Sequence, residues 1–247
     1  MSGELDWLIA RPVAHRGLHD AQKNVIENMP SAFTAAIAAH YGIECDVQVS
    51  ADGEAMVHHD DALGRLTEGN GRIDAMTAAA LKRVPFKATA ERMITLGELC
   101  DLVRGRAPLV IELKSRFDGD QRLARRVADT LSDHDGPAAA MSFDPAQIAA
   151  LRERAPALTR GMVAERRSRH HGKDASAATN PRTYFAQLVR ARPQFIAYSV
   201  NDLPAPVPMI ARKIFGLPLL AWTVRSPRDR QTAARYADQM IFEGFRP

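Results

Sequence analysis

Short apolar runs alternate with longer amphipathic stretches along most of this 247-residue chain. Buried strands of a parallel sheet appear as continuous apolar runs, whereas helices between them show a period near 3.6 residues. Eight runs qualify as strands, at residues 12–15, 42–49, 109–114, 138–143, 159–163, 195–199, 218–224 and 239–243. Eight strands with helices between them predict an α/β fold of the (β/α)8 TIM-barrel type, for which about 250 residues is the usual length.

The stretches between these runs carry helix signals. Leu123, Val127 and Leu131 are four residues apart and therefore share one helix face. Asp144 directly before a proline is typical of an N-cap, and we expect Ser31 to cap an alanine-rich helix. The predicted helices are residues 31–40, 121–132, 146–154, 184–191, 207–215 and 228–236.

Two segments interrupt the alternation of strands and helices. The first is residues 51–95, after the second strand. There the turn signal Asp52-Gly53 and the run 55–58 predict a hairpin, followed by a short inserted helical segment. Residues 164–180, after the fifth strand, are polar and basic, and we expect a loop there. Because the chain has no internal repeat and no low-complexity tail, we predict one domain over residues 1–247 that contains the insertion.

Carboxylates interrupt two of the apolar strands. Glu44 and Asp46 are two residues apart in the second strand, so they lie on one face of it, and Glu112 lies in the third. Each carboxylate alone could face solvent or pair with a lysine, but an unpaired carboxylate is costly in an apolar strand. Active sites of such barrels lie at the C-terminal strand ends. Three carboxylates from two neighbouring strands there favour a site for one hard divalent cation, Mg²⁺ or Ca²⁺.

Histidines and cations accompany these carboxylates. His15 and Arg16 end the first strand, and Lys114 ends the third. Two histidines can supply a general base and a general acid near neutral pH, and the cations can neutralise a phosphate. His58 and His59 compete for the second histidine position, because adjacent strand residues point to opposite faces. These groups favour metal-assisted phosphoryl transfer.

Other polar residues have a simpler interpretation. We assign His19, His40 and His134 to ordinary hydrogen-bonded roles, because a lone histidine is most often of this kind. Arg16 and Lys114 could also be plain surface cations. The basic residues 166–173 are interpreted as a solvated loop, with contact to substrate or a membrane as the less favoured alternative.

Several short motifs follow one another along nearly the whole chain. They are Ala14-His15-Arg16-Gly17, Glu27-Asn28, Glu44-Cys45-Asp46-Val47, Asp52-Gly53, His59-Asp60, Glu112-Leu113-Lys114, Ser142-Phe143-Asp144 and Trp222-Thr223-Val224. In order and spacing they resemble the signature of the glycerophosphodiester phosphodiesterase family. Each motif alone is weak, whereas the ordered combination is specific.

The resemblance implies a TIM barrel with a small insertion after its second strand, at residues 61–95 of this chain. It also implies hydrolysis of glycerophosphodiesters to an alcohol and glycerol 3-phosphate. It also selects His59, the histidine directly before an aspartate, over His58. In the family's proposed route, one histidine deprotonates the neighbouring glycerol hydroxyl, which attacks phosphorus, and the other protonates the leaving alcohol. The roles that carry over are His15 and His59 as acid and base, Glu44, Asp46 and Glu112 as ligands of Mg²⁺ or Ca²⁺, Arg16 and Lys114 as phosphate-binding cations, Glu27 as an orienting residue, and Trp222 as part of the pocket.

The chain departs from the family's pattern at three places. Ile26 stands where a proline usually precedes the Glu-Asn pair, and Ser50 replaces a threonine after the second-strand motif. Phe242-Glu243-Gly244 stands where the last strand often ends in a threonine-aspartate turn. The contribution of this last segment is left open by the sequence.

The composition limits which cellular locations and binding partners are expected. Two cysteines, no recognisable signal peptide and no long apolar run fit a cytoplasmic chain without stable membrane insertion. The formal net charge of +4 permits an anionic partner without selecting one. Because no aromatic–basic stripe indicates nucleic acid, we expect a small-molecule glycerophosphodiester as the partner, and homo-oligomer formation stays open.

Two other functions are compatible with these residues. A lysophospholipase D-type hydrolase would act on acylated phosphodiesters and would need an apolar groove or docking surface near the barrel mouth, where Phe117 is a weak candidate. A non-enzymatic barrel that only binds phosphorylated ligands would need neither both histidines nor all three carboxylates. Hydrolysis of glycerophosphodiesters is therefore favoured.

Overall fold

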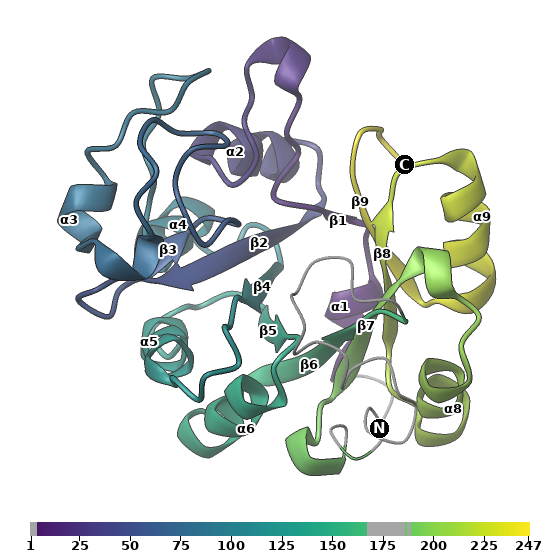
Figure 1. Ribbon diagram of the computed structural model, residues 1–247. Coiled ribbons are helices and arrows are strands. Elements are labelled where there is room, and N and C mark those ends of the chain that lie inside the picture. Colours follow the sequence, from purple (N-terminus) through teal and green to yellow (C-terminus); the bar gives the residue numbers. More distant parts are fainter. Residues whose placement is uncertain (1–3, 167–185, 187–188) are drawn as a thin grey trace.

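The computed structural model describes residues 4–166, 186 and 189–247, and it shows a closed ring of parallel strands with helices around it (Figure 1). Strand β1 closes the ring by pairing with both β2 and β9. The ring consists of β1 (Val13–Ala14), β2 (Gly42–Val49), β4 (Leu109–Leu113), β5 (Ala138–Ser142), β6 (Thr159–Ala164), β7 (Phe195–Ser199), β8 (Leu219–Val224) and β9 (Gln239–Phe242). The predicted (β/α)8 barrel is confirmed, and every predicted strand is present within one residue at each end.

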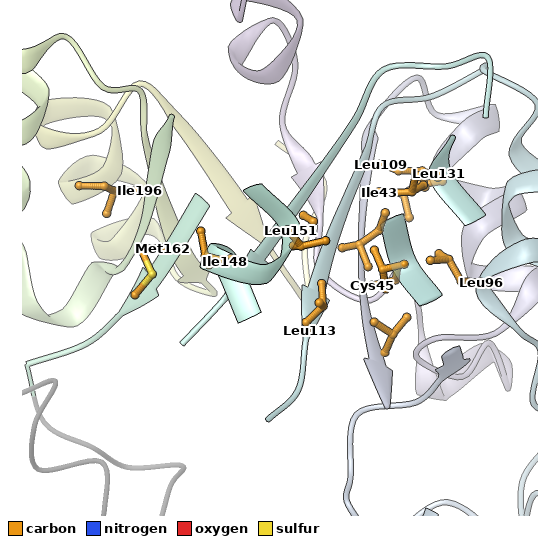
Figure 2. Close-up of a cluster of buried hydrophobic side chains, with 14 of the residues drawn as sticks. Ile43, Cys45, Leu96, Leu109, Leu113, Leu131, Ile148, Leu151, Met162 and Ile196 are labelled. Atoms are coloured by element: carbon orange, nitrogen blue, oxygen red, sulfur yellow. The ribbon is translucent and has the colours of Figure 1, made fainter. Parts of the chain in front are cut away.

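Alternate residues of β2 face opposite sides of the barrel wall, as the pleat of a strand requires. Ile43, Cys45 and Val47 belong to the layer between the strands and the helices, part of which is drawn in Figure 2. Glu44 and Asp46 consequently face the interior. The backbone of β2 thus places two carboxylates inside the barrel while its apolar residues anchor the strand from outside.

The interior of the barrel toward the N-terminal strand ends is apolar. Its buried side chains are Leu8, Val13, Val110, Ala139, Met141, Val163, Phe195, Ala197, Leu220 and Ile241. Leu8 comes from the short helix α1 (Asp6–Ile9), which lies inside the ring of strands in Figure 1 and was not predicted. Because α1 covers this end, the opposite end of the barrel is the one available for a site.

Helices surround the ring (Figure 1). They are α2 (Pro30–Ala38), α4 (Leu96–Val103), α5 (Arg122–Leu131), α6 (Pro145–Arg154), α8 (Pro206–Phe215) and α9 (Pro227–Tyr236). The predicted cap of α6 is confirmed, because the Asp144 side chain accepts the Ala146 N–H. Four of the eight residues of the predicted helix 184–191 lie outside the described residues. The described helices are all too short or too polar to cross a lipid bilayer.

Two helix predictions need correction. Ser31 does not cap α2, because the N-cap is Met29 and Pro30 is the first helical residue. Ser31 instead uses its N–H and hydroxyl to bind Glu91 at 2.9 and 2.6 Å. Helix α4 was not predicted, although its capping box is readable in the sequence as a threonine followed three residues later by a glutamate.

The predicted hairpin after β2 is confirmed. β3 (Ala55–Val57) pairs antiparallel with the end of β2. The following residues include the 3₁₀ turn η2 (Ile73–Ala75) and the helix α3 (Ala78–Leu81), and they pack on a small apolar cluster of their own. This cluster contains Ile26, Met29, Met56, Leu63, Ile73, Leu81, Phe86 and Met93. The segment 61–95 therefore lies beside the C-terminal ends of β1 and β2, next to the carboxylates.

Candidate active site

Three carboxylates meet near the C-terminal ends of β2 and β4. Asp46 lies beside Glu112 in the strand register, and one oxygen each of Glu44, Asp46 and Glu112 lies within 4.8 Å of the others. Their exposed fractions are 1, 1 and 8%. Burial first, and then the charges of Asp46 and Glu112, raise the pKa of Glu44 well above its usual range. The cluster consequently needs nearby positive charge for all three carboxylates to be ionised.

Two cations supply part of that charge. Lys114 Nζ lies 2.7 Å from Asp46 Oδ1 and 2.5 Å from Glu112 Oε1. Arg16 Nε lies 3.2 Å from Asp46 Oδ2. Burial favours the neutral form of Asp46, but Lys114 and Arg16 together hold the pKa of this carboxyl well below its usual range. These two cations therefore hold Asp46 in its charged form.

One oxygen of the cluster lacks compensation. Glu44 Oε2 accepts the Arg16 N–H at 2.9 Å, whereas Glu44 Oε1 is buried without a hydrogen-bond partner among the described residues. A hard divalent cation takes carboxylate oxygens as ligands. The all-oxygen donor set and the uncompensated oxygen of Glu44 fit Mg²⁺ or Ca²⁺ held by Glu44, Asp46 and Glu112.

Asn28 fixes Asp46 from the loop after β1. Its Nδ2 donates to Asp46 Oδ2 at 2.9 Å, and its Oδ1 accepts the Asp46 N–H at 3.2 Å. Asn28 and Arg16 both adopt a left-handed backbone, with φ of 58° and 56°. Asparagine tolerates this conformation better than most residues. Asn28 was in a recognised motif but was not predicted as a site residue, and its backbone preference was the available signal.

His15 ends β1 with each ring nitrogen near a carboxylate. Its Nδ1 lies 2.7 Å from Glu243 Oε2, and its Nε2 lies 3.9 Å from Glu44 Oε2. Burial lowers the pKa of His15, although the hydrogen bond with Glu243 opposes this effect. Glu243, directly after β9, was not predicted as a site residue, because 228 positions separate it from His15.

His58 and His59 face different surroundings. His58 is 2% exposed, and its ring packs edge-on against Phe86 of the insertion at 6.3 Å between centroids. The side chain of His59 is 28% exposed, and its Nδ1 lies 2.8 Å from Asp60 Oδ1. His59 and His15 both contribute to the low pKa of Asp46. Burial is the main influence on His58 and lowers its pKa.

A chain of ion pairs connects the first loop to the insertion. Glu27 Oε1 accepts hydrogen bonds from Arg16 Nη1 at 2.7 Å and from Arg65 Nη2 at 2.6 Å. Arg65 also donates to both Asp60 oxygens, at 2.6 and 3.1 Å. Glu27 thus holds Arg16 beside Asp46, and Arg65 holds Asp60 beside His59. No sequence pattern indicated Arg65, because its partners lie in two separate segments.

Trp222 lies in β8 at the edge of the apolar interior. Its ring packs edge-on against Phe143 at 5.5 Å between centroids, and its Nε1 is buried without a hydrogen-bond partner among the residues described. Within the described chain, no hydrogen bond or ion pair joins Trp222 to the carboxylates. His19, which was expected to be an ordinary histidine, has its Nε2 4.0 Å from Glu243 Oε1.

A polar hollow opens beside Lys114, between the insertion and the segment that follows β4. It is lined by Gln48, Val49, Asp61, Arg72, Asp74, Lys114, Ser115, Arg116, Asp118, Asp120, Leu123 and Gln147. Val49 and Leu123 are the apolar members of this lining, so the hollow suits a small polar group better than a hydrocarbon chain. Of the basic stretch 164–180, only residues 164–166 lie within the described part of the chain.

Comparison with known sequences gives one family match and several relatives. The model of the glycerophosphoryl diester phosphodiesterase family matches residues 15–244. A glycerophosphodiester phosphodiesterase of Caldanaerobacter subterraneus is 38% identical over 111 residues, which are 42% of this chain and 44% of that protein. Glycerophosphodiester phosphodiesterase 1 of Mus musculus is 29% identical over 116 residues, covering 43% of this chain and 34% of that protein. These matches span less than half the length of the curated relatives.

Solved structures share the fold over nearly the whole chain. A phosphodiesterase of Oleispira antarctica, in complex with the product sn-glycerol-3-phosphate, has a TM-score of 0.75 at 21% identity and covers 94% of this chain and 91% of that one. A glycerophosphodiester phosphodiesterase of Thermotoga maritima has a TM-score of 0.71 at 23% identity and covers 94% of this chain and 94% of that one. At these identities, the likeness establishes the barrel and leaves the chemistry to the residues of this chain.

Proposed function

The chain belongs to the glycerophosphoryl diester phosphodiesterase family, and from this premise we propose that it hydrolyses glycerophosphodiesters to an alcohol and glycerol 3-phosphate with a divalent cation. The observation that carries the proposal is the buried cluster of Glu44, Asp46 and Glu112 with two histidines beside it. Three carboxylates this close offer oxygen ligands to a hard divalent cation, and two histidines can supply the proton transfers that phosphodiester cleavage requires.

In this proposal, Glu44, Asp46 and Glu112 hold Mg²⁺ or Ca²⁺. The cation, when bound, withdraws electron density from the phosphodiester and compensates charge that develops on its oxygens. Asn28 keeps Asp46 oriented, and the Arg16 N–H orients Glu44. Lys114 lies between Asp46 and Glu112, so its ammonium is within reach of a phosphate oxygen near these carboxylates.

The proton transfers are assigned to His15 and His59. One removes the proton of the neighbouring glycerol hydroxyl, which attacks phosphorus and forms a cyclic phosphate, while the other protonates the leaving alcohol oxygen. Water then opens the cyclic phosphate with the two roles reversed. Each histidine has its Nδ1 beside a carboxylate, which leaves Nε2 for the reacting atoms.

Binding of the substrate is assigned to the remaining polar groups of the site. Arg16 and Lys114 neutralise the phosphate, and Glu27 orients Arg16. Trp222 lines the pocket from β8. The product-bound structure from Oleispira antarctica supports glycerol 3-phosphate as the product class.

The lysophospholipase D alternative is less well supported. It needs an apolar groove for an acyl chain, whereas the hollow beside Lys114 is lined mostly by charged and amide side chains. A small-molecule diester is the better fit. The cytoplasmic location and the formation of a homo-oligomer stay predictions.

The test is the release of glycerol 3-phosphate from glycerophosphocholine with Mg²⁺, with Ca²⁺ and with a chelator, for the wild type and for His59→Ala. We expect metal-dependent release that the substitution abolishes, while His58→Ala, a matched change at the neighbouring histidine, retains more activity. If no hydrolysis is detected with glycerophosphocholine, with other head groups or with lysophospholipids, the enzymatic proposal is wrong and a phosphate-binding barrel is left.

A further inference from the structure

We propose that Glu243 is a positioning residue that fixes the tautomer and orientation of His15. The inference rests on the proposed function, because it assigns to His15 the role of a proton-transfer group. It also gives a role to the segment Phe242-Glu243-Gly244, whose contribution the sequence left open.

The barrel backbone brings Glu243 to His15. β1 and β9 are adjacent, with Ala14 opposite Phe242, and the His15 N–H donates to the Phe242 carbonyl at 2.9 Å. The Glu243 N–H donates to the Val224 carbonyl of β8 at 3.0 Å. Both residues therefore start from backbone held in the sheet, and their side chains meet at 2.7 Å between Nδ1 and Oε2.

The contact determines which ring nitrogen carries the proton. An ionised carboxylate can only accept a hydrogen bond, so His15 Nδ1 must carry the proton that Glu243 accepts. The lone pair of neutral His15 is then on Nε2, the nitrogen 3.9 Å from Glu44 Oε2 on the side of the carboxylate cluster. This is the nitrogen that a proton-transfer role requires.

Glu243 is itself held ionised and in place. Burial favours its neutral form, but His15 and Arg225 lower its pKa well below the usual range. Arg225 Nη2 lies 2.8 Å from the same Oε2 that contacts His15. The Arg225 N–H donates to Asp229 in the first turn of α9 at 3.1 Å, so the arginine is tied to the helix that follows β8.

The same arrangement recurs at the other histidine. His59 Nδ1 lies 2.8 Å from Asp60, and Asp60 is paired with Arg65 at 2.6 Å. Both histidines thus have a carboxylate on Nδ1 and an arginine behind it, although the residues come from unrelated parts of the chain. A salt bridge that served stability alone would not need to be repeated at each proton-transfer group.

The kinetic test uses Glu243→Gln, Glu243→Asp and Arg225→Ala, with glycerophosphocholine as substrate. For Glu243→Gln we expect kcat to fall on the order of 10- to 100-fold, with KM changed by less than about threefold. Glu243→Asp should restore part of the lost kcat, and Arg225→Ala should lower kcat less than Glu243→Gln does. Arg228→Ala, at an exposed arginine of the same segment, is the matched control and should leave kcat unchanged.

A spectroscopic measurement separates this inference from the proposed function. In protein labelled with ¹⁵N-histidine, the ring nitrogens of His15 should show the proton on Nδ1 in the wild type and a shift toward the other tautomer in Glu243→Gln. The measurement needs no turnover. If the wild type is inactive on every glycerophosphodiester, the proposed function is wrong, but the tautomer of His15 still tests the role of Glu243. An unchanged tautomer, or an unchanged kcat in an active and folded Glu243→Gln protein, would overturn the positioning role.

Discussion

Without a bound cation, the surroundings of Glu44 favour its protonated form. Burial and two neighbouring carboxylates raise its pKa, and its Oε1 has no hydrogen-bond partner among the described residues. A carboxyl in such surroundings is stable when it is protonated or when a cation arrives. If a divalent cation binds to this cluster, its binding is therefore coupled to the loss of a proton from Glu44.

The first prediction concerns Glu44→Gln. Because the amide resembles the neutral carboxyl, the metal-free variant should unfold at a temperature close to that of the metal-free wild type. Wild type should gain about 2.7 kcal/mol when Mg²⁺ or Ca²⁺ is present at about 100 times its dissociation constant. The variant should gain far less, which thermal melts with chelator and with each cation would measure. An equal rise in both proteins would argue against Glu44 as a ligand.

The second prediction concerns Arg65, which connects Glu27 to Asp60. Arg65→Met should leave Asp60 and Glu27 without their shared partner, so His59 and Arg16 should both lose support. We expect kcat/KM for glycerophosphocholine to fall on the order of 10-fold, as is typical when outer supporting groups are removed. Arg92→Met, at another exposed arginine of the insertion whose partners are backbone carbonyls, is the control. Equal activities of the two variants would contradict the role of Arg65.

Residues of the site differ in how far the sequence predicts them. His15, Glu44, Asp46 and Glu112 interrupt apolar strands, so their positions at the barrel mouth follow from the strand pattern. Asn28, Arg65 and Glu243 act through contacts with other site residues. Those contacts form where loops from separate segments come together, as with His15 and Glu243. No local sequence pattern predicts which of these loops will be neighbours.

At the scale of elements, apolar strands were easier to predict than short helices. Each buried strand shows a continuous apolar run, so all eight were found. Helix α1 has only four residues, too few to show a helical period. Helix α4 was not predicted because it directly follows the segment 51–95, which lacks the regular alternation of strands and helices. The cap of α4 was nevertheless visible in Thr95 and Glu98, so this miss was avoidable.

The third prediction tests that cap. Thr95→Ala removes the oxygen that accepts the Glu98 N–H, so the free energy of unfolding should fall by about 1 kcal/mol. Thr34→Ala, at an exposed site inside α2, should change it by less than about 0.5 kcal/mol. Denaturant midpoints at constant slope give both values. A cost at Thr34 as large as the cost at Thr95 would mean that the capping bond is not the cause.

The fourth prediction concerns the ion pair between the insertion and the segment after β4. The hydrogen bond from Arg72 has the largest effect and lowers the pKa of Asp74; burial opposes it, and the hydrogen bond from Arg116 lowers the pKa further. A carboxyl whose pKa is lower in the folded state stabilises the protein above its unfolded pKa of about 3.9, and the contribution disappears as pH falls through the folded value. Asp74→Asn should therefore destabilise at pH 7 by at most about 1 kcal/mol, because the side chains of Arg72 and Arg116 are 40 and 58% exposed and solvent screens the pairs.

Melting temperatures of wild type and Asp74→Asn across pH 7 to 3 would measure this dependence. The difference between the two proteins should be largest near neutral pH and should shrink as pH falls below about 4. Asp101→Asn, at an exposed aspartate of α4, should show no such convergence. A difference that stays constant across the range would mean that Asp74 acts through packing and not through its charge.

At the scale of the whole molecule, the two ends of the barrel interior differ in composition. Apolar side chains and α1 fill the end near the strand starts, and charged side chains occupy the end where the strands finish. Seven of the eight strands, all except β2, contribute a side chain to the apolar end, and β2 is held by its pairing with β1 and β4. The packed end therefore holds in register the strand ends that carry the site. A substitution in the packed half should therefore affect stability first.

The last prediction uses Gly161, where β6 lies against Phe195 of β7. A Cβ at this glycine would lie 2.3 Å from the Phe195 ring, so Gly161→Ala should destabilise the barrel by about 1–3 kcal/mol through overpacking. Phe195→Leu removes the ring atoms that the new Cβ meets. The double variant should lose less stability than the sum of the two single-variant losses, by about 1 kcal/mol or more, because both substitutions act on the same packed space. Additive costs in a double-mutant cycle would mean that the ring moves aside and that packing inside the barrel is looser than this contact requires.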